Sequence, residues 1–189
     1  MSKVIRDDID KFFNYGVSVP TKTLYMGEPD GTEHTMAEKV IKGLIILDAK
    51  ARSKKLTIIM NNIGGDEHHG LAMYDAIKAC KSPTVTKVFG HAMSMGAWIL
   101  QASDRRLMAR NATMLLHYGT FGYEGHAKDF DRWSTENKRL CKLMEDHFLE
   151  RIKEKHPRYT REALQELIRF DRFLTATEAE DLGLVDKVI

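Results

Sequence analysis

One apolar run constrains the fold of this chain more than any other feature of its sequence. The run Leu56-Thr57-Ile58-Ile59-Met60 is continuous, short and rich in β-branched residues, which is typical of a strand buried on both faces. Strands of this kind belong to parallel sheets whose faces are covered by helices. The run therefore predicts an α/β fold.

Strand-like and helix-like segments alternate on either side of this run. Further strands are expected at residues 23–26, 85–89, 105–109, 113–116 and 184–189, and helices at 36–51, 69–80, 97–102, 126–155, 159–168 and 175–182. Thr35, with Glu38 three residues later, is expected to cap the first of these helices. The repeated alternation predicts a mostly parallel sheet flanked by helices.

A serine stands at one of the predicted strand-to-helix turns. Ser94 lies in the segment Gly-His-Ala-Met-Ser-Met-Gly-Ala at residues 90–97, between a β-branched run and an apolar helical run. At the start of a helix, free backbone N–H groups and the helix dipole favour a developing negative charge. The turn therefore suits a nucleophilic serine, although a serine that only caps the helix would have the same local sequence.

Three other features supply what a serine hydrolase needs besides its nucleophile, namely a base, a carboxylate that orients the base, and donors for the oxyanion. His117 follows the predicted strand 113–116, Asp171 precedes a capped helix, and Gly64-Gly65 follows the buried strand. Each has a simpler alternative: a structural histidine, a surface ion pair, a plain turn. Spacing alone does not bring the four together.

Composition narrows the class of protein. The 189 residues suit one domain, and the 43% hydrophobic and 30% charged content is ordinary for a globular protein. The formal net charge of +2, spread along the chain, argues against a nucleic-acid partner. The apolar runs are too short to cross a membrane, the N-terminus lacks the apolar core of a secretory signal, and the isolated Cys80 and Cys141 are expected to be reduced thiols. These features favour a cytoplasmic protein.

Five segments carry a resemblance when taken in order. Residues 61–65 are Asn-Asn-Ile-Gly-Gly, and residues 90–97 hold the serine turn quoted above. Residues 115–119 are Leu-Leu-His-Tyr-Gly, residues 170–176 are Phe-Asp-Arg-Phe-Leu-Thr-Ala, and residues 178–186 are Glu-Ala-Glu-Asp-Leu-Gly-Leu-Val-Asp. Together they resemble the ClpP family of self-compartmentalising serine peptidases from about Thr23 to the last residue. The departures, which include the absence of two prolines and Phe170 in place of an arginine, suit a divergent or phage-type member.

The resemblance implies a fold and a domain organisation. The fold would be the α/β, ClpP/crotonase-like β-α spiral with a projecting handle helix at about residues 126–156. Residues 23–189 would form the peptidase domain, and residues 1–22 an N-terminal arm or axial segment.

The resemblance also implies a set of site residues. Ser94 would be the nucleophile, His117 the general base and Asp171 its orienter. The amides of Gly65 and Met95 would form the oxyanion hole. Gly64, Tyr118, Gly119 and Thr120 would contact an extended polypeptide substrate.

Partners follow from the same resemblance. Seven copies of the chain would form a ring, and one ring or two stacked rings would enclose the active sites. An AAA+ unfoldase would feed unfolded chains into this chamber. No cofactor or metal is expected, since the chain has no Gly-x-x-x-x-Gly-Lys-Ser/Thr motif and its cysteines lack metal-ligand spacing.

Two other functions are compatible with these residues. The first is a catalytically silent ring subunit that acts as a scaffold. The second is an acyl-CoA-processing enzyme of the crotonase fold, in which backbone amides polarise a thioester and Asp66 and Glu67 are the candidate carboxylates. Hydrolysis of peptides or hydration of an enoyl-CoA would discriminate between the enzymatic hypotheses.

Overall fold

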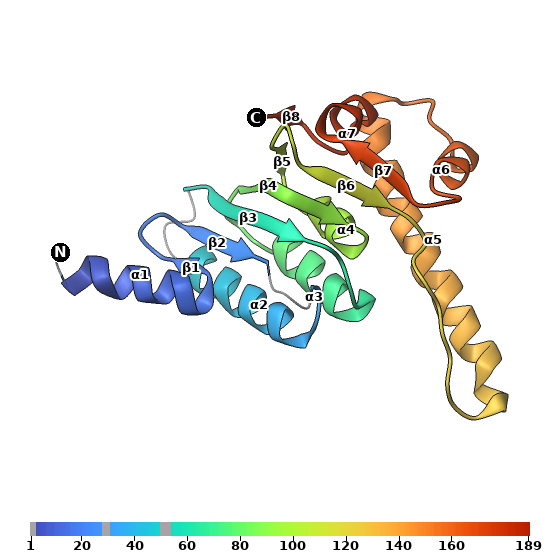
Figure 1. Ribbon diagram of the computed structural model, residues 1–189, viewed down its shortest axis with the longest axis horizontal. Coiled ribbons are helices and arrows are strands. Elements are labelled where there is room, and N and C mark those ends of the chain that lie inside the picture. Colours follow the sequence, from blue (N-terminus) through green and yellow to red (C-terminus); the bar gives the residue numbers. More distant parts are fainter. Residues whose placement is uncertain (1–2, 28–30, 50–53) are drawn as a thin grey trace.

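The computed structural model describes residues 3–27, 31–49 and 54–189 (Figure 1). In this part of the chain the strands are β1 Val17–Ser18, β2 Thr23–Met26, β3 Leu56–Asn62, β4 Thr84–Met93, β5 Arg105–Met108, β6 Thr113–Leu116, β7 Arg172–Thr175 and β8 Lys187–Val188. The helices are α1 Lys3–Tyr15, α2 His34–Asp48, α3 Glu67–Lys78, α4 Met95–Leu100, α5 Phe130–Lys155, α6 Arg161–Leu167 and α7 Ala176–Leu182, with a short 3-10 turn at Ala127–Asp129.

The strands form one sheet that is mostly parallel, which confirms the predicted α/β class. The order along the sheet is β1-β2-β3-β4-β5-β8, and the neighbours from β2 onward run parallel. Strand β6 pairs with β4 in parallel and with β7 in antiparallel orientation. Strand β7, which the sequence patterns did not predict, extends this branch of the sheet toward the C-terminal helices (Figure 1).

Strand β4 is long because it serves two neighbours in succession. Its first half, Val85 to Val88, pairs with β5, and its last three residues pair with β6. Between the halves Gly90 adopts a φ of 86°, and the Asn61 side chain accepts a hydrogen bond from the His91 amide at 3.1 Å. A Cβ at position 90 would lie 2.5 Å from the Asn61 side chain. Glycine therefore lets the strand change partners next to the serine turn.

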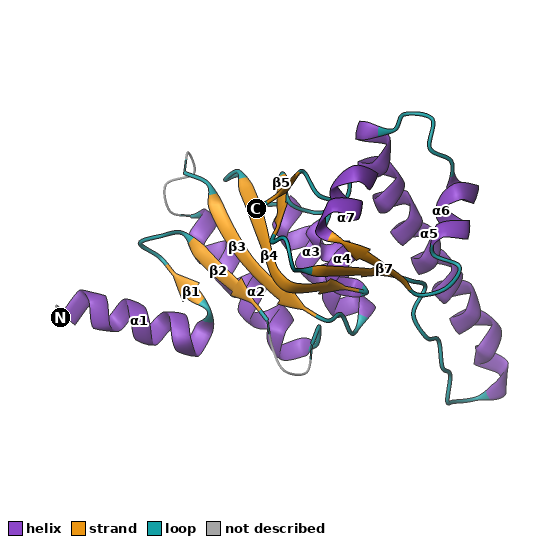
Figure 2. Ribbon diagram, turned by 45° about the horizontal axis from the view of Figure 1, so that its top comes forward, coloured by secondary structure: helices purple, strands orange, loops and turns teal. Residues whose placement is uncertain are grey.

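Helices cover one face of the sheet. Helices α2, α3 and α4 lie together on that face (Figure 2), where Leu56, Ile58 and Met60 are completely buried. The opposite face is only partly covered, since Ile59 is half-buried and its neighbour Tyr25 is 39% exposed. The prediction of a strand buried on both faces is therefore correct for one face and wrong for the other in the isolated chain.

The predicted long helix is present as α5, which extends away from the sheet (Figure 1). The segment expected to form an N-terminal arm or axial segment contains helix α1. The cap assigned to Thr35 is wrong: Glu33 is the N-cap of α2, and its carboxylate accepts the Met36 amide at 2.8 Å. Helix α2 ends at Asp48, and the last two residues predicted for it, 50 and 51, lie outside the described residues.

Candidate active site

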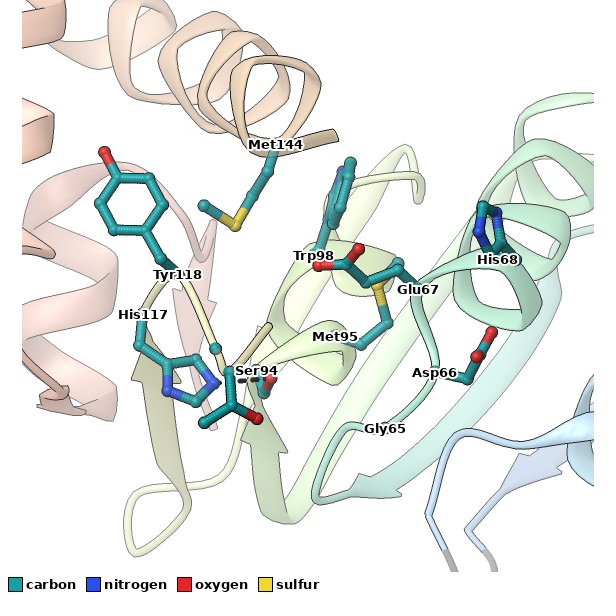
Figure 3. Close-up of a pocket in the computed structure, with 12 residues that line it drawn as sticks. Gly65, Asp66, Glu67, His68, Ser94, Met95, Trp98, His117, Tyr118 and Met144 are labelled. Carbon is teal, nitrogen blue, oxygen red and sulfur yellow. Dashed lines mark hydrogen bonds between the residues drawn. The ribbon is translucent and has the colours of Figure 1, made fainter. Parts of the chain in front are cut away.

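Ser94 occupies the turn between β4 and α4 in a strained conformation. Its backbone has a φ of 52° and a ψ of −123°, a region that costs a residue with a side chain roughly 1–3 kcal/mol. Although Ser94 stands at the N-cap position of α4, its side chain makes no capping hydrogen bond. The Ser94 hydroxyl instead lies 2.7 Å from Nε2 of His117 (Figure 3). The capping alternative is therefore wrong for this side chain.

Three side chains form a continuous chain of hydrogen bonds. Beyond the 2.7 Å contact between Ser94 Oγ and His117 Nε2, His117 Nδ1 lies 3.0 Å from Oδ1 of Asp171. The imidazole is mostly covered, whereas the Asp171 carboxylate is 62% exposed. With a proton on Nδ1 shared with Asp171, Nε2 is left free to accept the proton of the serine hydroxyl.

Sheet register explains why these distant residues meet. Met93 pairs with Leu115 across β4 and β6, and the Ser94 amide donates to the Leu115 carbonyl at 2.9 Å, so the serine turn lies next to the end of β6. Across β6 and β7, Leu116 pairs with Arg172. One further step of this antiparallel register places Asp171 opposite His117. Strand β7 is thus what delivers the carboxylate to the imidazole.

The loop Gly64-Gly65 packs directly against Ser94. A Cβ at Gly64, whose φ is 95°, would lie 2.6 Å from the Ser94 Cβ and 3.0 Å from the Met95 amide nitrogen. Thr32 holds the loop from the other side: its amide donates to the Gly64 carbonyl and its carbonyl accepts from the Asp66 amide. These bonds use the residues that flank Gly65, and the Gly65 amide takes part in neither of them.

A buried asparagine that sequence reasoning did not select fixes the same loop. Asn62 is 1% exposed, and its Oδ1 accepts the Gly64 amide at 2.7 Å and the Thr32 hydroxyl at 3.1 Å. Met95, which follows Ser94, is the first residue of α4. Its amide therefore has no intrahelical partner. Gly65 and Met95 both line the cavity next to Ser94, so their amides are candidates to bind an oxyanion.

A cavity of about 460 Å³ opens beside the serine. Its lining includes Ser94 and His117 together with Gly65, Met95, Tyr118, Gly119, Thr120, Trp98, Met144, Asp66, Glu67 and His68. Figure 3 shows Met144 entering from α5, Trp98 from α4 and Glu67 from the start of α3. Of the residues predicted to contact substrate, Gly64 is not part of the lining. It packs instead against the Cβ of Ser94.

An ionic network anchors the residue that follows the histidine. The Tyr118 hydroxyl donates to Glu145 of α5 at 2.7 Å, and Glu145 also accepts from Arg161 at 2.5 Å and from Gln165. Glu145 is 5% exposed. Burial raises the pKa of this carboxyl, but its hydrogen bonds outweigh burial and leave the pKa below its usual value. The network ties the loop after His117 to helices α5 and α6.

A second contact from α5 fixes the tryptophan in the cavity wall. Trp98 Nε1 donates to His147 Nδ1 at 2.7 Å, and the His147 ring stacks on Tyr74 with centroids 4.4 Å apart. Burial is the main cause of a lowered pKa at His147, which favours the neutral ring that this hydrogen bond requires. The Trp98 indole is therefore held in place from two sides.

The candidate carboxylate pair for thioester chemistry is divided between two roles. Asp66 is the N-cap of α3, and its side chain accepts the His69 amide at 2.9 Å. Glu67 lines the cavity.

In residues 3–27, 31–49 and 54–189 there is no cluster of three or more His, Cys, Asp or Glu side chains arranged to hold a metal ion, and no helix long and apolar enough to cross a membrane.

Comparison with known proteins identifies the family. The Clp protease family matches residues 20–189. The chain belongs to the Clp protease family. It is 30% identical over 177 residues to the ATP-dependent Clp protease proteolytic subunit of Deinococcus radiodurans, an alignment that covers 93% of this chain and 83% of the relative. The resemblance inferred from the five sequence motifs is thereby confirmed, and the chain is a protease by family.

Proposed function

We propose that this chain is a serine endopeptidase in which Ser94, His117 and Asp171 form the catalytic triad. The observation that carries the proposal is the hydrogen-bond chain from Ser94 through His117 to Asp171, with distances of 2.7 and 3.0 Å, at a cavity large enough for a side chain. Membership of the Clp protease family supports the same reaction.

The geometry suits an acyl-enzyme mechanism. Ser94 Oγ attacks the carbonyl carbon of the scissile peptide bond while His117 Nε2 takes the hydroxyl proton. Asp171 holds the other ring nitrogen and stabilises the imidazolium. The oxyanion is bound by the Gly65 and Met95 amides, and His117 then gives its proton to the leaving amine. A water molecule, deprotonated by the same imidazole, hydrolyses the ester and restores Ser94.

The substrate is an unfolded polypeptide or a peptide bound in extended form. Tyr118, Gly119 and Thr120 line the cavity immediately after the base and are placed to contact the chain on that side, and Gly64 shapes the loop that carries the Gly65 amide. An extended chain suits this site because its backbone carbonyls are not already paired within a helix or sheet and can reach Ser94 and these amides.

The active form is a homo-oligomer, a heptameric ring alone or stacked as two rings, that encloses the active sites. Large apolar side chains remain exposed on α2, in the first turn of α5 and in the segment before that helix. Among them are Ile45, Ile46, Phe121, Phe130 and Trp133. Exposed apolar surface of this extent is typical of protein interfaces. The name of the Deinococcus relative, an ATP-dependent proteolytic subunit, supports an AAA+ unfoldase as the partner that supplies substrate.

The test combines peptide hydrolysis with native mass spectrometry. Ser94→Ala should reduce hydrolysis of small fluorogenic peptides by at least about 10³-fold while leaving the oligomeric mass unchanged. Hydrolysis that survives the substitution contradicts the triad. An intact ring with no hydrolysis in the wild type favours the scaffold alternative, and hydration of an enoyl-CoA favours the thioester alternative.

A further inference from the structure

Glu67 places a carboxylate in the wall of the active-site cavity. It is the first residue of α3, directly after the N-cap Asp66, and it lines the same cavity as Ser94 and His117. Its side chain is directed into the space beside Trp98 rather than away from the protein (Figure 3). The residue is half-buried. A negative charge therefore borders the space next to the nucleophile.

This carboxylate has no cationic partner in the described part of the chain. No hydrogen bond or ion pair is formed by the Glu67 side chain with any residue described there. Burial raises the pKa of Glu67 and the nearby Asp66 adds to this effect, while His68 lowers it. On α5, burial raises the pKa of the Cys141 thiol, and the negative charge of Glu67 raises it further. The charge is thus partly desolvated, and the neighbouring His68 offsets only part of this effect.

Besides the polar Asp66 and His68 that flank Glu67, three large apolar side chains form part of the cavity wall. Met95, Trp98 and Met144 are 3%, 2% and 8% exposed, and all three line the cavity. A ligand that fills this space must satisfy two different surfaces. A long aliphatic stem packs against the thioethers and the indole, and a cation at its end pairs with the carboxylate. Lysine and arginine side chains have this structure.

We infer that Glu67 is a specificity-determining residue that selects lysine or arginine at the position whose carbonyl Ser94 attacks. This inference rests on the proposed peptidase function. The assignment to that substrate position follows from the cavity itself, which shares Ser94 and the Gly65 and Met95 residues with the oxyanion site. The side chain attached next to the attacked carbonyl is the one that enters this space. A cation bound there also relieves the desolvated charge of Glu67.

The experiment compares peptides that differ in one charge. Two fluorogenic peptides carry arginine or citrulline, its neutral near-isostere, before the scissile bond, and a third carries leucine. Wild-type kcat/KM should favour arginine over citrulline by roughly tenfold, as for other hydrogen bonds between charged groups. Glu67→Gln should abolish this ratio. Glu150→Gln removes the same charge from an exposed position on α5 and should preserve it, which separates local pairing from long-range attraction.

A reversed charge gives an independent check. Glu67→Lys should favour a peptide with glutamate at this position over one with glutamine. Equal rates for arginine and citrulline in the wild type, or a preference that persists in Glu67→Gln, would overturn the inference while leaving the peptidase intact. Cleavage of the leucine peptide alone would do the same. Failure to cleave any peptide would instead contradict the proposed function, and the inference with it.

Discussion

Gly64 is the position at which a single methyl group should separate folding from catalysis. In Gly64→Ala the new Cβ would lie 2.6 Å from the Ser94 Cβ, 2.8 Å from the Met93 carbonyl oxygen and 3.0 Å from the Met95 amide nitrogen. Two of these neighbours are backbone atoms and the third is a Cβ, so none can rotate away. The φ of 95° is itself unfavourable for alanine.

These contacts predict a loss of both catalytic rate and folding stability in Gly64→Ala. Relief of the overlap requires Ser94 to move by a large fraction of an ångström relative to His117, and a shift of about 1 Å lowers catalysis by roughly 100-fold. Overpacking together with backbone strain should destabilise the fold by about 2–4 kcal/mol. We therefore expect kcat/KM for a fluorogenic peptide to fall by about two orders of magnitude in protein that circular dichroism shows to be folded.

The control is Gly122→Ala, where the added Cβ has no heavy atom within 4 Å. This variant should keep wild-type stability and activity. If folded Gly64→Ala has the wild-type kcat/KM, the close packing of this loop on the nucleophile is not important for catalysis and the argument from geometry is refuted.

Two further predictions concern ion pairs that hold the site and the sheet. Glu145→Gln should lower kcat/KM by roughly tenfold by loosening Tyr118 beside the base. Asp146→Asn removes the exposed partner of the same Arg161 and should leave kcat/KM unchanged and alter the free energy of unfolding by less than about 1 kcal/mol. An equal loss of kcat/KM in the two variants would contradict a role for the buried network. Asp186→Asn should destabilise the protein by about 3 kcal/mol near neutral pH, because Arg106, 2% exposed, loses the carboxylate that accepts hydrogen bonds from its guanidinium and its amide. Burial raises the pKa of Asp186, but hydrogen bonds from Arg106 outweigh it and leave the folded-state pKa lowered, so this stability is present above the unfolded pKa of about 3.9 and is lost as the pH falls through the folded value. Urea titrations at a series of pH values should show the difference between wild type and Asp186→Asn shrink below about pH 4, and a difference that does not change with pH would refute the assignment.

The part of the fold that local sequence determines was predictable. The apolar run of β3, the alternation of strands with helices and the serine turn all depend on neighbours close in sequence. The capped helix expected at residues 175–182 is also present as α7, where Thr175 and Glu178 exchange the hydrogen bonds of a capping box. These features need no knowledge of distant contacts.

The features that were missed or wrongly predicted depend on contacts between residues far apart in the sequence or on where an element begins. Strand β7 has only four residues and exists because it pairs with β6, so its own sequence carried little signal. The choice between Glu33 and Thr35 as the cap of α2 depends on where the helix begins, since both side chains can accept an amide. His147 packs on Tyr74 and Trp98 because α5 crosses that part of the fold, a contact that no local pattern indicates.

The candidate site depends partly on local sequence and partly on contacts between distant segments. Sequence motifs selected Ser94, His117, Asp171 and the two glycines, but only the register of β4, β6 and β7 explains how they meet. Asn62 lies in one of the five segments that carry the resemblance, but its own role was not predicted, and Glu145 lies in none of them. The role of each depends on burial that tertiary structure alone creates.

The most direct test of the central claim is covalent labelling of the wild-type protein with a fluorophosphonate, followed by peptide mapping. Attack of an activated hydroxyl on phosphorus expels fluoride and leaves a stable adduct. We predict one adduct per chain, located on Ser94, and a labelling rate reduced by orders of magnitude in folded His117→Ala. The absence of an adduct, an adduct on another serine, or an undiminished rate in His117→Ala would contradict the claim that Ser94 is a nucleophile activated by His117.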